Sequence, residues 1–446
     1  MTITKQVQPK KLKGFRDFLP HQVSQRKKMI DVIWRHAVQA GFQAIETPVL
    51  EYAETLLGAG GQETDKEVYR FEDHGGRAVG LRFDLTVPFA RFVAEHQGTL
   101  VFPFKKLQIG NSWRGEKPQK GRYREFCQAD VDIIGVDSQA ADIEVLLNIL
   151  GNLNRLVPAS FTMSIGHRKV LSAILQHAFP GLSATGEACA LIALDKTAKI
   201  GVEKVRQLLL EIDGATPEGA DLLQKILSSK DAAGDSDLSI LTRIFAENED
   251  ISIEIERIRQ TLSVLRGLVS GTKARVRLDL NIARGLGYYT GIVFETVIDQ
   301  LPGFGSISSG GRYNDLVTRF SKQSLPGIGG SIGVDRLLAA LEELGETENE
   351  TRQGIFVAVA TADALPYAFH IVDELRNGTD EMVDIGLNLG KLGNQFKYAD
   401  RRKFAKVIVV GEEERLAGTY TMKDLTTGDE VRDLRRDQLL LNMKRR

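Results

Sequence analysis

Apolar and polar residues alternate along two segments of the chain, 104–113 and 125–134. Alternation with a period of two residues is typical of β-strands. The stretch between them, residues 114–124, is rich in Lys and Arg and contains the turn-forming residues Gly and Pro. The pattern therefore predicts a long β-hairpin with a basic tip. A solvated loop whose charges serve only solubility is the alternative explanation for this tip.

The segment before this hairpin predicts a helix and a strand. Apolar residues between Pro20 and Gly41 recur at helical spacing, with the proline at the start and the glycine at the end of the pattern. Residues 42–50 then read as an extended strand interrupted by Pro48. Because proline cannot donate a ladder hydrogen bond, we expect this strand to lie at a sheet edge or an interface.

The second half of the chain changes character three times. From about 168 to 270 the pattern is helical and predicts a helical insertion. Strand patterning returns after residue 276, and a glycine-rich approach at 327–333 leads into a helix with leucines on one face. After an apolar-free linker at 346–352, strands and helices alternate up to residue 411, which predicts a small α/β domain with a mainly parallel sheet.

Length and charge set the broad class of protein. A chain of 446 residues is long enough for roughly two to four domains. Its 58 Lys and Arg against 59 Asp and Glu leave it near neutral, so any nucleic-acid partner must be held by local basic patches. The 2 cysteines and 7 scattered histidines lack disulfide or ligand spacing, so we expect a reducing cytosol and no transition metal held by the protein. The sequence indicates no signal peptide and no membrane span.

Four places carry more polar chemistry than their settings need. Arginines at the hairpin tip can bind phosphate through two hydrogen bonds. Asp84 and Thr86 share one face of a segment expected to be extended, and can hold an ammonium group or form an ordinary turn. Arg284 lies in a glycine-punctuated loop, where it can neutralise charge at a reacting centre or cap carbonyl groups. Arg336 lies in the first turn of a helix, where a cation opposes the helix dipole, so we expect it to face an anion.

Taken in order, these segments resemble a known family along nearly the whole chain. Three segments resemble the three motifs of the class II aminoacyl-tRNA synthetases: residues 21–50, 114–126 (RGEKPQKGRYREF) and 330–336 (GSIGVDR). The first of these motifs is a dimer element. Residues 283–291 (ARGLGYYTG) and 309–313 (SGGRY) are similar to the two signature segments of the histidyl-tRNA synthetase family. Residues 395–400 (QFKYAD) resemble a segment of that family's anticodon-binding domain.

The resemblance implies an α+β fold, in which a class II catalytic domain with an antiparallel sheet carries a helical insertion and precedes a small C-terminal α/β domain. The implied boundaries are 1–167 and 271–345 for the two parts of the catalytic core, 168–270 for the insertion and 353–446 for the anticodon-binding domain. The implied function is ATP-dependent formation of histidyl-adenylate and transfer of histidine to the 3′ end of its tRNA. The enzyme would be a cytoplasmic homodimer, with Mg²⁺ held mainly through the phosphates of ATP.

The resemblance also implies roles for individual residues. Arg284 and Arg114 would be catalytic. The histidine-binding residues would be Asp84, Thr86, Arg114, Gln128, Asp132, Arg284, Tyr288 and Tyr289. The ATP-binding residues would be Arg114, Glu116, Phe126 and Arg336, with Phe126 stacked on adenine and Arg336 on the γ-phosphate. The hairpin would thus grip ATP, its tip would touch the acceptor end of the tRNA, and no residue would be a metal ligand.

Two positions depart from the family pattern. Gly287 stands where the family loop usually has Asp, and Tyr313 is followed by Asn-Asp where Asp-Gly or a similar pair is common. The first change removes a carboxylate beside the pocket, which puts in doubt any part for it in orienting Arg284. Neither change removes a residue with an implied role.

Two other functions share parts of this pattern. A non-catalytic regulatory subunit of ATP phosphoribosyltransferase has a synthetase-like core but typically lacks the C-terminal α/β domain and some ATP-binding residues. An amino-acid or acyl ligase that acts without tRNA should also lack that domain. This chain contains residues 353–430 and keeps Arg114, Arg284 and Arg336. These features favour the synthetase.

Overall fold

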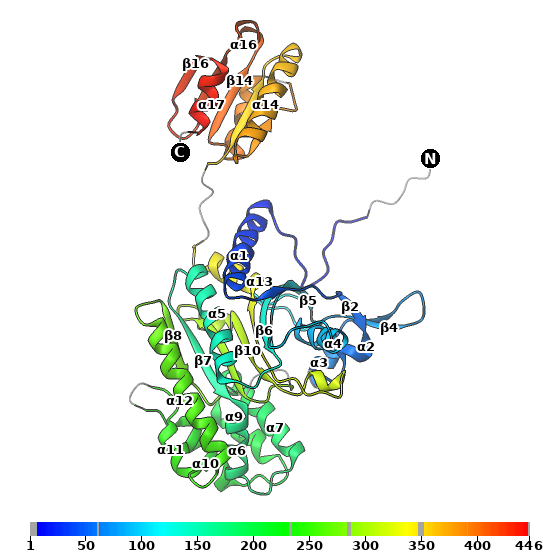
Figure 1. Ribbon diagram of the computed structural model, residues 1–446, viewed down its shortest axis with the longest axis vertical. Helices are drawn as coiled ribbons and strands as arrows, with labels where there is room; N and C mark the ends of the chain where they lie inside the picture. Colours follow the sequence, from blue (N-terminus) through cyan, green and yellow to red (C-terminus); the bar gives the residue numbers. More distant parts are fainter. Residues whose placement is uncertain are drawn as a thin grey trace. The chain divides into compact units, whose positions relative to one another are not determined.

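A computed structural model describes residues 7–59, 62–231, 234–282, 287–346, 352–389 and 391–444. The chain forms two compact units, Met1–Thr347 and Glu348–Arg446 (Figure 1). Most of the expected linker at 346–352 lies outside the described residues, and so does Arg284.

The larger unit is built on an eight-stranded sheet with the strand order β1-β5-β6-β11-β10-β9-β7-β8. The strands are β1 (Gln43–Ala44), β5 (Phe104–Trp113), β6 (Glu125–Ile134), β7 (Phe161–His167), β8 (Ala274–Leu278), β9 (Ile292–Ile298), β10 (Ser308–Tyr313) and β11 (Gly327–Gly333). From β5 to β7 in this order, each strand is antiparallel to the next. The two outer strands are parallel to their neighbours, β1 to β5 and β8 to β7. The predicted hairpin is confirmed as β5 and β6, and so is the α+β class.

The two faces of this sheet differ in polarity because side chains alternate along each strand. On β6, Cys127, Ala129, Val131 and Ile133 belong to the large apolar core. The helices α1 (Pro20–Gln39), α5 (Gln139–Leu156) and α13 (Val334–Glu343) pack in that core (Figure 1). The intervening residues of β6, including Gln128 and Asp132, therefore lie on the opposite face. The candidate site is built there.

Helices dominate the chain between β7 and β8, as the pattern predicted. They are α6 (Arg168–Ala178), α7 (Ala184–Asp195), α8 (Thr197–Ile200), α9 (Val202–Leu210), α10 (Pro217–Ser228), α11 (Leu238–Ile244) and α12 (Glu249–Val269), which pack together in Figure 1. Side chains of Ser183, Thr216, Asp237 and Asn248 accept hydrogen bonds from first-turn N–H groups of α7, α10, α11 and α12. Such caps satisfy donors that a helix leaves unpaired at its start, so local sequence sets these boundaries.

A second, three-stranded sheet shows that the expected strand over 42–50 was wrong. It has the order β2-β4-β3, formed by β2 (Leu50–Tyr52), β3 (Arg70–Glu72) and β4 (Ala78–Leu81), next to α2 (Ala53–Leu56), α3 (Gln62–Glu67) and α4 (Thr86–His96). Residues 42–50 contribute β1 to the large sheet and the start of β2 to this one. The break falls at Thr47 and Pro48, whose carbonyl oxygens accept hydrogen bonds from the buried Arg82 guanidinium instead of strand neighbours. Short 3₁₀ turns at η1 (Pro302–Phe304) and η2 (Val317–Arg319) complete this unit.

The smaller unit contains a five-stranded sheet with the order β13-β12-β14-β15-β16. Its elements are β12 (Ile355–Val359), η3 (Ala362–Ala364), α14 (Leu365–Gly378), β13 (Val383–Ile385), α15 (Leu392–Arg401), β14 (Lys406–Val410), α16 (Glu412–Ala417), β15 (Tyr420–Asp424), β16 (Glu430–Leu434) and α17 (Arg436–Lys444). The predicted alternation up to β14 is confirmed. The mainly parallel sheet is correct only for β13, β12 and β14, because β15 and β16 add two antiparallel pairings.

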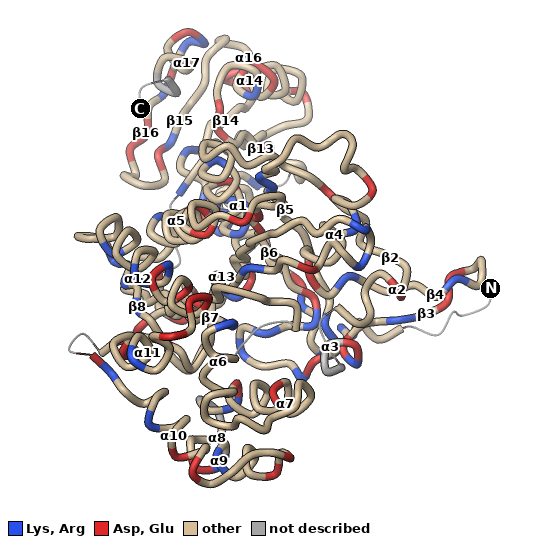
Figure 2. Tube along the Cα trace, turned by 60° about the horizontal axis from the view of Figure 1, so that its bottom comes forward, with Lys and Arg blue, Asp and Glu red and all other residues tan. Residues whose placement is uncertain are grey.

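Charged residues of both signs are interspersed along the trace (Figure 2). Within the described part of the chain, no helix is long and apolar enough to cross a membrane. The described residues also contain no group of three or more His, Cys, Asp or Glu side chains that could hold a metal ion.

Candidate active site

A buried ion pair lies at the centre of the polar face. Lys106 on β5 and Asp132 on β6 are cross-strand neighbours. The Lys106 Nζ lies 2.8 Å from Asp132 Oδ2, and the two side chains are 0 % and 2 % exposed. Each charge therefore depends on the other, because an unpaired charge in such a place would be costly.

The second oxygen of Asp132 is also engaged. The hydroxyl of Tyr313, from the second signature segment, donates a hydrogen bond of 2.6 Å to Asp132 Oδ1. Gly329 on the neighbouring strand β11 faces the same carboxyl group, and a Cβ atom there would lie only 1.9 Å from Oδ1. Only glycine fits at this position unless the carboxylate moves, so the glycine-rich β11 makes room for the acid.

Asp84 lies in the turn before α4, with Thr86 as the first residue of the helix. The expectation that both lie in an extended segment was therefore wrong. Asp84 Oδ1 accepts a hydrogen bond from the Val87 N–H at 3.0 Å, which satisfies a first-turn donor and starts the helix. Its Oδ2 accepts a hydrogen bond from the Tyr288 hydroxyl at 3.1 Å. Burial of the carboxyl group raises the pKa of Asp84 above its usual range.

Three tyrosines connect Asp84 with Asp132. The ring centroids of Tyr288 and Tyr289 are 4.9 Å apart and those of Tyr288 and Tyr313 are 6.1 Å apart, both in edge-to-face geometry. Burial raises the pKa of Tyr288 well above its ordinary value, so its hydroxyl stays a donor at neutral pH. The structure thus brings the predicted residues Asp84, Thr86, Tyr288, Tyr289 and Asp132 together around one polar region, in which Thr86 hydrogen-bonds Tyr288.

Arg114 opens the hairpin tip beside this region. Its Nε donates a 3.0 Å hydrogen bond to the carbonyl of Phe83, the residue before Asp84. The guanidinium carbon lies 5.2 Å from the centre of the Phe126 ring on the opposite strand. Glu116 pairs with Arg122 across the tip, with 3.1 Å between Oε2 and Nη1. The tip therefore presents an oriented arginine over an aromatic ring, an arrangement suited to a planar base and its phosphates.

Arg336 lies in the first turn of α13 and reaches the other side of the hairpin tip. Its Nε donates to the carbonyl of Gly121 at 3.1 Å and its Nη1 to the carbonyl of Ser306 at 2.8 Å. The neighbouring Asp335 is buried and accepts hydrogen bonds from Arg26 Nε and from the Cys127 N–H, both at 2.8 Å. These contacts fix the start of α13 against α1 and β6. A phosphate contact for Arg336 stays a prediction.

Three buried residues on this face were missed from the sequence: Lys106, Asp130 and Tyr313. Asp130 lies two residues from both Gln128 and Asp132, so strand alternation alone would have placed all three side chains together. Lys106 stands at a position of β5 that strand alternation places opposite Asp132, but Lys105 beside it gave no way to tell which lysine is buried. Gln128 Nε2 donates to Ser331 Oγ at 2.9 Å, which links β6 with β11.

Comparison with known proteins decides the family. A family model of histidyl-tRNA synthetase matches residues 14–337, and a model of the anticodon binding domain matches residues 354–446. The chain belongs to the histidyl-tRNA synthetase family. This assignment agrees with the resemblance of the motifs and covers both units.

Individual members of the histidyl-tRNA synthetase family are similar over almost their whole length. The histidine–tRNA ligase of Rhodopirellula baltica is 44% identical over 424 residues, which cover 94% of each chain. The crystal structure of histidyl-tRNA synthetase from Nostoc sp. PCC 7120 matches with a TM-score of 0.83 and 30% identity, covering 99% of this chain and 100% of the other. A Bacillus halodurans structure, described as an ATP phosphoribosyltransferase regulatory subunit/histidyl-tRNA synthetase, has a TM-score of 0.74 at 22% identity over 91% of this chain and 99% of the other. That likeness shows the shared fold alone.

Proposed function

We propose that the protein is a cytoplasmic histidine–tRNA ligase. It joins histidine and ATP into histidyl-adenylate and pyrophosphate, and then transfers the histidyl group to the 3′-terminal adenosine of the tRNA. The observation that carries this proposal is the convergence of Asp84, Tyr288 and Asp132 from three separate segments beside Arg114. In the proposed enzyme, residues 1–167 and 271–345 form the catalytic domain, 168–270 the insertion and 353–446 the anticodon-binding domain.

The chemistry requires positioning and positive charge. The carboxylate of histidine attacks the α-phosphate of ATP in line with the departing pyrophosphate, so the protein needs no nucleophile of its own. We assign the α-amino group to Asp84 and Thr86, because Asp84 is a buried acid and both residues hydrogen-bond Tyr288, and to Gln128 on family grounds. We assign the imidazole ring to the region of Asp132, Tyr288 and Tyr289. Selection is then strong, because an apolar analogue would leave these buried groups unpaired.

The nucleotide is assigned to the hairpin and α13. Arg114 binds the α-phosphate and the substrate carboxylate, Phe126 stacks on adenine and Glu116 contacts the edge of the base. Arg336 holds the γ-phosphate, and Arg284, on family grounds alone, supplies further charge at the reacting phosphate. Mg²⁺ enters as part of the ATP substrate, and phosphate oxygens and water supply most of its ligands.

Histidine-dependent exchange of labelled pyrophosphate into ATP tests the activity directly. The regulatory subunit would give no exchange, and a ligase that acts without tRNA would give exchange without aminoacylation of tRNA. Against both stand the match of residues 354–446 to an anticodon binding domain and the presence of Arg114 and Arg336. Exchange together with charging of histidine tRNA is the expected result.

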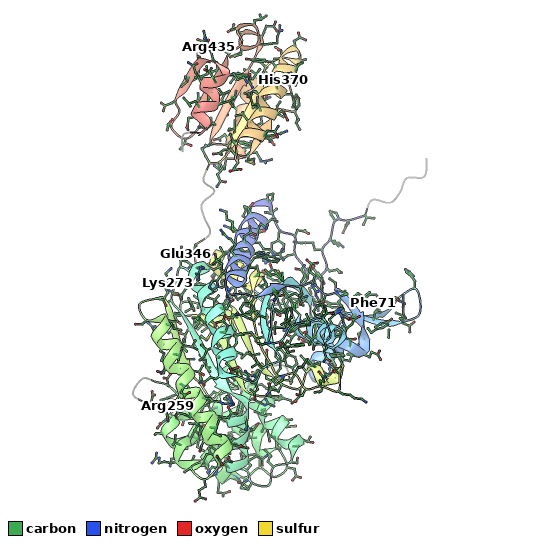
Figure 3. All side chains as sticks on the ribbon, in the orientation of Figure 1. Phe71, Arg259, Lys273, Glu346, His370 and Arg435 are labelled. Atoms are coloured by element: carbon green, nitrogen blue, oxygen red, sulfur yellow. The ribbon has the colours of Figure 1, made fainter. Side chains whose placement is uncertain are left out.

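A homodimer is proposed from the three-stranded sheet. Four apolar residues are exposed there: Val49, Leu50, Tyr52 and Phe71. The exposed fraction is 53% for Tyr52 and 50% for Phe71, which Figure 3 labels on a projecting segment. A hollow of about 780 Å³ lies beside them, lined by Pro48, Glu51, Val79, Arg91 and Phe320 among others. Exposed apolar side chains gathered at a sheet edge are typical of an interface, and most homo-oligomers are twofold.

We predict that Leu50→Asp converts this dimer into a monomer, because it buries a charge in the proposed interface. Sedimentation velocity at micromolar concentration measures the change. Leu416→Asp is the matched control, since Leu416 is equally apolar and 71% exposed but lies in the smaller unit. A wild-type protein that sediments as an active monomer would contradict the proposal.

The smaller unit carries a basic segment suited to RNA. Lys391, Lys397, Arg401, Arg402 and Lys403 lie exposed on or beside α15. Gln395 makes two hydrogen bonds with the backbone of Val359, which fixes α15 against β12. Phe396 is partly buried against the local core, whereas Tyr398 is 43% exposed. An exposed aromatic ring among cations can stack on a splayed base.

We predict that Arg401→Glu combined with Arg402→Glu raises the KM for tRNA about tenfold or more, because two phosphate contacts become repulsive. Pyrophosphate exchange should be unchanged, and the effect on the KM for tRNA should be largest at low salt and shrink as the salt concentration rises, because the wild-type phosphate contacts are then screened. The control is Arg432→Glu combined with Arg435→Glu, which also reverses two positive charges. Arg432 lies on β16, at one edge of the sheet, and Arg435 follows that strand directly. An unaltered KM in the first variant would exclude this surface from tRNA binding.

A further inference from the structure

The polar face contains buried acceptors with no partner. Among the described residues, Oε1 of Gln108, Oε1 of Gln128 and Oδ1 of Asp130 are fully shielded from solvent and accept no hydrogen bond. Their positions in the sheet bring them together. Gln108, on β5, is the cross-strand neighbour of Asp130 on β6, and Gln128 lies on β6 two residues before Asp130. Buried acceptors are normally paired, so a group of unpaired ones indicates a donor that arrives with a ligand.

Asp130 differs from Asp132 in how its carboxyl group is used. Both oxygens of Asp132 have protein partners, Lys106 and Tyr313. Asp130 has the hydroxyl of Ser331, its neighbour on β11, and one free oxygen. Both oxygens of Asp132 are thus occupied by protein donors, whereas one oxygen of Asp130 can still accept a hydrogen bond from a ligand.

The charges around Asp130 are unbalanced toward the negative. The titratable and charged groups that act on it or respond to it are Lys106, Asp132, Asp84, Arg82, Cys127, Tyr289 and Tyr313. Lys106 is already paired with Asp132, and Arg82 is turned to backbone carbonyls. Burial, together with the neighbouring Asp132 and Asp84, raises the pKa of Asp130 to about 7. A ligand rich in N–H donors would relieve this excess.

We propose that Asp130 is a further substrate-binding residue, whose free Oδ1 accepts a hydrogen bond from the imidazole N–H of histidine. The inference rests on the proposed function. Asp130 lies on the strand between Gln128, assigned to the amino group, and Asp132, assigned to the ring. It is also near enough to Tyr289 for its charge to help raise the pKa of that phenol. The ring N–H is the donor that remains once the amino group is bound at Asp84.

Asp130→Asn tests the proposal, because asparagine keeps the shape and the bond to Ser331 but removes the charge. In pyrophosphate exchange near pH 8, the KM for histidine should rise about tenfold or more, as expected for loss of a hydrogen bond to a charged group. The KM for ATP should stay within about twofold. Asp299→Asn is the matched control: Asp299 also has a shielded, unpartnered oxygen, but it follows β9 and accepts its hydrogen bond from Thr162.

A pH series separates binding from a merely structural role. The quantity to follow is the KM for histidine of Asp130→Asn divided by that of the wild type. This ratio should fall toward one as the pH drops below about 7, because the carboxyl group of Asp130 then becomes neutral, like the amide of the variant. Titration of free histidine cancels in this ratio. If the asparagine variant does not fold, Asp130→Ser takes its place, since serine also removes the carboxyl group, leaves the bond from Gln128 to Ser331 in place and should likewise raise the KM for histidine.

The failures of the two proposals are distinguishable. A wild-type protein without histidine-dependent exchange would overturn the proposed function and the inference with it. An active wild type whose KM for histidine is unaffected by Asp130→Asn would overturn only the inference, and so would a raised KM whose ratio stays constant with pH.

Discussion

Replacing Arg114 with alanine is expected to lower the rate of histidine-dependent pyrophosphate exchange by about a hundredfold or more. The carbonyl of Phe83 and the ring of Phe126 hold this guanidinium in place before any substrate binds. Its charge is needed most when the α-phosphate gains negative charge, and a prearranged cation pays no reorganisation cost at that moment. The loss should therefore appear in kcat and not only in KM.

Arg114→Lys separates charge from geometry. Lysine keeps the positive charge but lacks the planar fork that binds phosphate through two hydrogen bonds, so we expect an intermediate rate. Arg155→Ala is the control, because Arg155 is an exposed arginine of α5 whose Nη1 donates to the carbonyl of Gly151 in the same helix. Exchange by Arg114→Ala at the wild-type rate would remove Arg114 from the reaction.

Lys106→Met is expected to lower the free energy of unfolding by about 3–5 kcal/mol, the range for breaking one side of a buried ion pair. The substitution conserves much of the side-chain volume but leaves the Asp132 carboxylate without its cation. Urea unfolding near pH 7 measures the change. Lys105→Met is the matched control on the same strand: Lys105 is part-exposed and its Nζ pairs with Glu144 Oε1 at 2.6 Å, so its loss should cost at most about 1 kcal/mol.

A double variant shows whether the cost comes from the stranded charge. Asp132→Asn added to Lys106→Met removes the carboxylate while keeping an acceptor for the Tyr313 hydroxyl. The double variant should be more stable than Lys106→Met alone, because no unpaired charge stays buried. If Lys106→Met is as stable as Lys105→Met, Asp132 finds another counter-charge and the ion pair does not support the site.

Local patterns were enough to find the elements and much of the site. The alternation around residues 114–124 identified the hairpin, the helical pattern between 168 and 270 identified the insertion helices, and the family resemblance directed attention to Asp84, Arg114 and Tyr288. Where prediction failed, a side-chain hydrogen bond to the backbone set the structure, locally at Asp84 and over a long range at Arg82. Thr86 begins a helix because the Asp84 carboxylate accepts a first-turn N–H, and the strand over 42–50 divides because Arg82 takes its carbonyl oxygens.

The sequence by itself determined the hairpin of β5 and β6, the helices between β7 and β8, the alternation of strands and helices from β12 to β14 and the family, because each depends on short-range periodicity or on contiguous motifs. Only the tertiary structure decided which side chains of the polar face form hydrogen bonds and ion pairs with one another. Lys106 meets Asp132 through the register of β5 and β6, and Tyr313 reaches the same carboxyl group from 181 residues away. Such partners are set by sheet register and by the space that Gly329 leaves open, and neither is written in the local pattern.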